Sequence, residues 1–168
     1  MFTSPQYHYQ IYATLHTMEI IDPLVAFAPY ITLAGFVVGL GAVTVIDLLG
    51  FLGRHSSYWT EATIRTHKVT KPLIWIGLLL VLFGGWLLFY SLSFPPITII
   101  FFSILGILLL NGLFLSLLVS PYLLTRERNG LATVPLPLSW QRSIAASFMI
   151  SFTGWWTLFV LVVFTISS

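Results

Sequence analysis

Four long apolar segments dominate the chain, and two charged loops and one uncharged turn separate them. The segments run from about residue 24 to 50, 72 to 91, 97 to 119 and 143 to 166. A helix needs about 20 apolar residues to cross a hydrocarbon core of about 30 Å, so each segment predicts a membrane-spanning helix. The pattern therefore predicts an all-α, polytopic integral membrane four-helix bundle made of two helical hairpins, in a single domain over residues 1–168.

Residues 1–22 precede the first apolar segment and have a different character. They are polar, with tyrosines interspersed, and Ile11, Leu15 and Met18 fall on one side of a helix. This pattern is typical of a short helix that lies at the membrane interface.

Composition agrees with a membrane protein. The 168 residues are 58% hydrophobic and only 7% charged, with a mean hydropathy of +0.98, which cannot cover the surface of a water-soluble globule. The absence of cysteine excludes disulfides and thiolate metal sites. The net charge of +2 comes from loop residues and not from a basic face, so we expect the lipid bilayer, and no nucleic acid, as a partner.

The distribution of basic residues predicts how the bundle is oriented. All seven Lys and Arg residues lie between the first and second or between the third and fourth apolar segments. Because cytoplasmic loops are enriched in Lys and Arg, both charged loops are predicted to face the cytoplasm, with the N-terminus and the C-terminus outside. A bacterial or archaeal inner or plasma membrane is the expected location.

Small residues recur at helical spacing in the first two segments. One line consists of Ala28, Thr32, Gly35, Gly39 and Ala42, and another of Gly77, Gly84 and Ser91. Such lines let helices approach closely, within one chain or between protein partners, including copies in a homo-oligomer. A shift of 71 residues also superposes Thr32 on Ser103 and Gly35 on Gly106, which hints that the two hairpins are related.

Two pairs of histidines are candidate ligands. His55 and His67 flank the first charged loop, and imidazole binds haem iron or copper. His8, His16 and Glu19 form a second candidate metal site, because a helix from residue 8 to 19 places them on one side. The predicted topology puts the two sets on opposite sides of the membrane. The alternative in both cases is interfacial side chains without a metal.

Asp47 and Asn111 are the candidate residues for a proton or ion site. Asp47 lies near the end of the first apolar segment, and an acid within a membrane span is by default a functional suspect. The alternative is that Asp47 lies at the interface and pairs with Arg54 or a loop lysine. Asn111, Ser151 and Thr44 fall at similar depth, which predicts a layer of hydrogen bonds between helices.

The stretch from Thr66 to Gly85 resembles the start of the second span in small four-helix proteins related to copper resistance protein D, in which a basic loop leads into an apolar helix that carries glycines. The resemblance implies copper handling or haem binding in a four-helix bundle. It carries over no metal ligand, because the first span of this chain has no histidine.

Signatures of hydrolases, metalloproteases and nucleotide-binding enzymes are absent from the sequence. The first hypothesis is therefore a non-enzymatic membrane protein, either self-associating or an accessory subunit of a larger membrane complex. The alternatives are a haem-binding or copper-binding membrane protein that uses the histidines, and a small permease that uses Asp47.

Overall fold

The computed structural model describes residues 5–52, 57–90, 95–131, 134 and 136–167; within these ranges the side chains of residues 5–23, 57–60, 63, 64 and 95 are not described. The described part is helical, without strands. Its elements are α1 (Pro5–Leu52), α2 (Ser57–Tyr90), α3 (Pro95–Phe114), the π-helix η1 (Leu115–Val119), α4 (Ser120–Arg128) and α5 (Leu138–Ser167).

Four stretches of helix are long and apolar enough to cross a membrane, as predicted. They are Leu24–Leu52, Arg65–Tyr90, Pro96–Arg128 and Leu138–Ser167. The third stretch combines α3, η1 and α4 into one rod. In the part of the chain that the structure describes, the apolar runs therefore predicted the number and type of the long apolar helices correctly.

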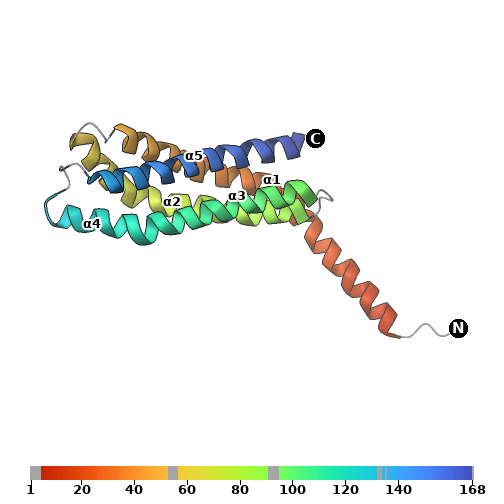
Figure 1. Cartoon of the computed structure of the whole chain (residues 1–168). Coiled ribbons are helices and arrows are strands. Elements are labelled where there is room, and N and C mark those ends of the chain that lie inside the picture. The colour runs from red at the N-terminus through yellow and green to blue at the C-terminus, as the bar shows by residue number, and fades with distance from the viewer. Residues whose placement is uncertain (1–4, 53–56, 91–94, 132–133, 135, 168) are drawn as a thin grey trace.

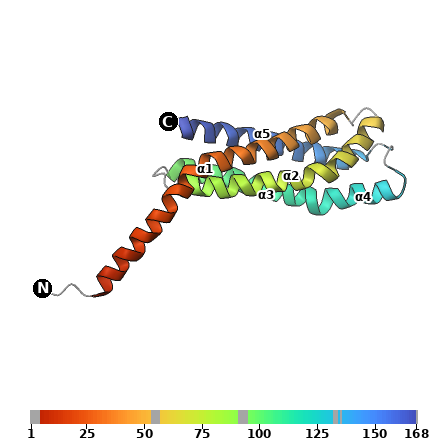
Figure 2. The same cartoon turned by 180° about the vertical axis from the view of Figure 1, so that it is seen from behind.

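The four stretches run side by side in alternating directions (Figures 1 and 2). The end of α1, the start of α2, α4 and the start of α5 lie together at one end of the bundle, which we call the charged end (Figure 1). The end of α2, the start of α3 and the end of α5 lie at the opposite end. Contacts between α1 and α2 are the most extensive, and α5 packs on both α1 and α3.

The N-terminal part of α1 extends beyond the bundle. Residues 5–22, here called the N-terminal arm, are helical but do not form a separate short helix, because α1 continues through them for 48 residues. At 1.5 Å per residue, α1 is about 72 Å long. Both views show the arm leaving the bundle at an angle (Figures 1 and 2). Pro23 and Pro29 follow the arm within α1, and each removes a backbone hydrogen bond of the helix.

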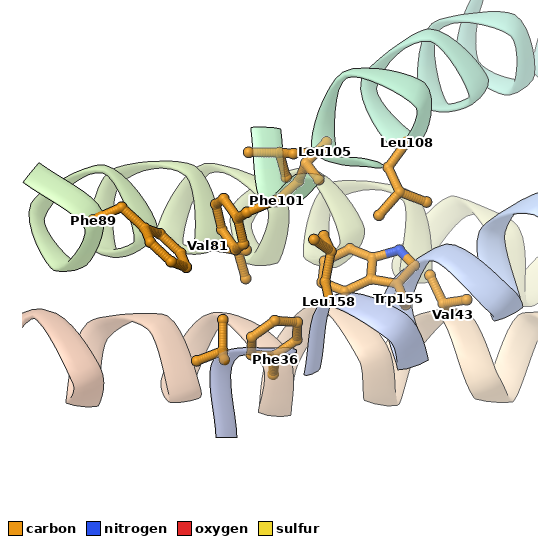
Figure 3. Packing of buried hydrophobic residues seen from close by; sticks show 11 residues of the cluster. Phe36, Val43, Val81, Phe89, Phe101, Leu105, Leu108, Trp155 and Leu158 are labelled. Carbon is orange, nitrogen blue, oxygen red and sulfur yellow. The ribbon is translucent and has the colours of Figure 1, made fainter. Parts of the chain in front are cut away.

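The core of the bundle surrounds Trp155 of α5, which is 1% exposed. Figure 3 shows its indole ring between Leu108 of α3 and Val43 of α1. Phe36 meets the ring edge-on, with ring centroids 6.0 Å apart. Gly39 makes room for Trp155, because a Cβ atom at residue 39 would overlap the indole ring.

The small-residue lines meet at the interface of α1 and α2. A Cβ atom at Gly77 would overlap the backbone of Gly39 and would lie 2.8 Å from the carbonyl oxygen of Gly35. One helical repeat further, a Cβ atom at Gly84 would overlap the side chain of Thr32. The two backbones touch here without intervening side chains, as glycine-lined membrane helices do.

The third and second spans are longer than the sequence indicated. The third apolar segment was predicted to end near residue 119, but the helix continues past Pro121 to Arg128. In η1 the backbone N–H of Ser120 donates to the carbonyl of Leu115, five residues back. This wider turn directly precedes Pro121, which has no N–H to donate to the helix. The helix continues through the proline because the turn before it has already departed from the α-helical bonding pattern. Similarly, α2 runs through Pro72 from Ser57, so Pro72 does not begin the span.

Candidate functional site

A set of polar side chains from all four spans lies inside the half of the bundle nearer the charged end. We call this set the polar layer, and its members are Asp47 (α1), Trp75 (α2), Asn111 (α3), Ser116 (η1), and Ser147 and Ser151 (α5). Polar groups inside an apolar bundle are costly unless they are hydrogen-bonded. Their partners therefore decide what the layer can do.

Asn111 and Ser147 form a paired hydrogen bond between α3 and α5. The Asn111 Nδ2 donates to the Ser147 carbonyl oxygen at 3.0 Å, and the Ser147 hydroxyl donates to Asn111 Oδ1 at 2.6 Å. Both side chains are buried. Because both ends of the Asn111 amide have a partner in Ser147, the role of Asn111 in this structure is to join two helices.

Ser116 in η1 receives two hydrogen bonds from α2. The Trp75 Nε1 donates to the Ser116 hydroxyl oxygen at 3.0 Å, and the Lys71 Nζ donates to the Ser116 carbonyl oxygen at 3.4 Å. In the bonding pattern of η1, that carbonyl would accept from residue 121, and Pro121 has no N–H. Lys71 thus donates to the Ser116 carbonyl, for which Pro121 supplies no N–H donor.

Asp47 lies beside a cavity of about 40 Å³ within the polar layer. Its walls include Val43 and Asp47 of α1, Trp75 of α2, Gly112 of α3, and Ser151 and Trp155 of α5. The carboxylate atom Oδ2 of Asp47 is buried and has no hydrogen-bond partner among the described residues. The alternative pairing with Arg54 concerns a residue outside the described ranges.

The predicted hydrogen-bond layer of Asn111, Ser151 and Thr44 is only partly correct. Asn111 bonds to Ser147, one turn before Ser151. Thr44 is exposed on the outer side of α1 and donates to the Leu40 carbonyl of its own helix at 2.7 Å. Counting residues from the helix ends correctly placed these side chains at a similar level of the bundle. It did not show which of them face one another.

The histidine candidates are not brought together with other ligands. His67 is half-buried on α2, and its Nε2 has no hydrogen-bond partner among the described residues. His55 lies outside the described residues. His8, His16 and Glu19 lie in the N-terminal arm, where side chains are not described. In the described part of the chain no three His, Asp or Glu side chains come close enough to hold a metal, so the haem and copper hypothesis gains no support there.

One ion pair and one aromatic stack tie helices together at the charged end. Lys68 of α2 pairs with Glu127 of α4 at 2.9 Å, and Tyr122 of α4 stacks on Trp140 of α5 with ring centroids 4.1 Å apart. Gly130, with φ of 72°, ends α4. The second charged loop is accordingly shorter than the gap between the predicted segments that end at residue 119 and begin at residue 143, because helix occupies both of its ends.

Comparisons with protein-family models, with curated proteins and with solved structures find no match for this chain. The resemblance to copper resistance protein D relatives therefore stays a prediction. Over the residues that the structure describes, fold and site together define an all-helical bundle with four helices suited to crossing a membrane and a polar layer inside it.

Proposed function

We propose that the protein is a non-enzymatic membrane subunit that binds another protein through its N-terminal arm. The arm carries this proposal, since it is helical yet extends away from its own bundle (Figure 1). Helices in proteins gain most of their stability from packing of an apolar face, and a contact outside the bundle would supply such packing for the arm. The apolar positions Ile11, Leu15 and Met18 supply a face for such a contact.

The length of α1 favours a protein contact. A span needs about 30 Å of helix, and the bilayer with its headgroups is about 40–45 Å thick. The helix α1, at about 72 Å, reaches well beyond this thickness. The arm therefore has the reach to contact a neighbouring subunit, either a second copy or another member of a membrane complex.

The mass of the assembly, in nanodiscs formed directly from the cell membrane so that bound partners are retained, tests this proposal. The full chain is expected to show a mass larger than one copy, and deletion of residues 2–22 is expected to leave a single bundle of unchanged helical content. Leu15→Glu places a charge on the predicted apolar face and is expected to act like the deletion. Ala13→Glu, on the opposite side of the same helix, serves as its control. A single-copy mass for the full chain would contradict the proposal.

The proposed orientation puts the charged end in the cytoplasm, with the arm and the C-terminus outside. Its support is that the described Lys and Arg residues gather at one end of the bundle (Figure 1). Since the chain has no cysteine, a single introduced thiol reports its own side. Ser167→Cys is expected to react with an impermeant reagent in intact cells, whereas Asn129→Cys reacts only after lysis. The opposite labelling pattern would reverse the orientation.

A further inference from the structure

The cavity beside Asp47 has the size and lining of a hydrated site. Its volume is about 40 Å³, and one water needs about 10–15 Å³ of such space, so two or three waters fit. A cavity lined only by apolar groups stays dry, but the residues that line this one include Asp47 of α1 and Ser151 of α5, whose side chains are polar.

Trp155 adds a hydrogen-bond donor to the same cavity. Figure 3 shows its indole nitrogen on the side of Leu108 and Val43, which also line the cavity. The indole N–H is a donor only and the carboxylate is an acceptor, so water between them can be oriented by both. Asp47, Ser151 and Trp155 thus face one space from two helices.

Among the residues that the structure describes, no side chain with a positive charge lines this cavity. On the packed elements, Lys71 donates to the Ser116 carbonyl, and Lys68 pairs with Glu127. Arg142 is exposed at the start of α5, and His67 lies one turn before Lys71 on α2. Among the described residues, Asp47 therefore has no ion-pair partner. A carboxylate inside an apolar bundle is costly unless a cation accompanies it.

We propose that the cavity is a binding site for one small monovalent cation, either a proton or Na⁺, held by the Asp47 carboxylate and by water that Ser151 and Trp155 orient. Among its described lining residues, the cavity has one acidic residue, Asp47, and its other polar residues are neutral, so its charge matches a cation of charge +1. Oxygen ligands and water suit a hard cation, and the volume leaves no space for a larger solute. This site is independent of the arm, so either proposal can fail without the other.

Thermal unfolding of the detergent-purified full chain tests the site, because a cation that binds only the folded state raises the unfolding midpoint. If the cation is a proton, the midpoint falls as the pH is raised from acid to alkaline. If it is Na⁺, the midpoint at alkaline pH rises with Na⁺ and saturates, but not with choline at equal ionic strength. In either case Asp47→Asn, which keeps the side-chain shape, is expected to abolish the response, and Ser151→Ala to weaken it.

Two control variants keep the experiment decisive. Glu127→Gln removes an acid at the charged end outside the cavity and is expected to keep the cation response. Arg54→Gln is also expected to keep it; a response that is absent from the unchanged chain and appears only in Arg54→Gln would identify this arginine as the partner of Asp47 and overturn the proposal. Equal responses of the unchanged chain and Asp47→Asn to both pH and Na⁺ would overturn it as well.

Discussion

The two helical hairpins pack by different means. In the hairpin of α1 and α2, Gly77 faces the backbone of Gly39, so the closest contact joins two main chains. In the hairpin of α3 and α5, a Cβ atom at Gly154 would lie 2.8 Å from the end of the Leu108 side chain, and Asn111 and Ser147 add hydrogen bonds. An added atom at the first interface would require two backbones to separate. At the second interface a side chain could change its conformation instead.

The internal similarity of the two halves is not mirrored in this packing. Thr32 is fully buried against α2, but its counterpart Ser103 is exposed. Gly35 is covered by Val81, while a Cβ atom at the matching Gly106 would meet nothing within 4 Å. Positions that superpose in sequence therefore serve different purposes in the two hairpins.

The largest expected effect is at the rigid interface. Gly77→Val places a branched side chain against the backbone of Gly39, which cannot move aside. We expect a loss of about 3 kcal/mol in the free energy of unfolding, or no folded bundle, since overpacking commonly costs about 1–3 kcal/mol and more where nothing can shift. Unfolding in mixed micelles with increasing denaturing detergent measures this loss.

Gly106→Ala is the matched control, because it adds a methyl group where there is open space. Its free energy of unfolding is expected to stay unchanged or to rise by up to about 1 kcal/mol, the helix preference of alanine over glycine. If both glycine variants behaved alike, the distinction between the two hairpins would be wrong.

A smaller effect is expected at the hydrogen-bonded interface. Asn111→Ala and Ser147→Ala should each lower the free energy of unfolding by about 1–2 kcal/mol. The double variant should lose less than the sum, by about 1 kcal/mol, because the two side chains share one interaction. Ser143→Ala, whose hydroxyl bonds only within α5, is the control. Additive losses would show that the pair contributes no coupling.

The part of the fold that local pattern determines was predictable. Apolar runs indicated four spanning helices, and the glycine spacing indicated that α1 could be approached closely. The end of the third span was not predictable. Proline is expected to end a helix because it interrupts α-helical hydrogen bonding, and this expectation assumes that the turn before it is α-helical. The wider turn of η1 removes that condition at Pro121.

The candidate site was predictable only as a list of side chains. Asp47 and Asn111 stood out because polar residues are rare in the spans. Their surroundings depend on how each helix is rotated about its axis, which the sequence of one chain does not specify. Hence the sequence did not indicate that Asn111 bonds to Ser147. Nor did it indicate that Trp155, a large apolar residue of the kind that fills a core, lines the cavity beside Asp47.

The uninterrupted rod from Pro96 to Arg128 has a mechanical consequence. At 1.5 Å per residue its 33 residues measure about 50 Å, more than the roughly 30 Å of a hydrocarbon core. Its charged end is clamped to α2 by Lys68 and Glu127 and to α5 by Tyr122 and Trp140. Because the described rod contains no loop, these two contacts at its charged end also set the direction in which its apolar length leaves that end.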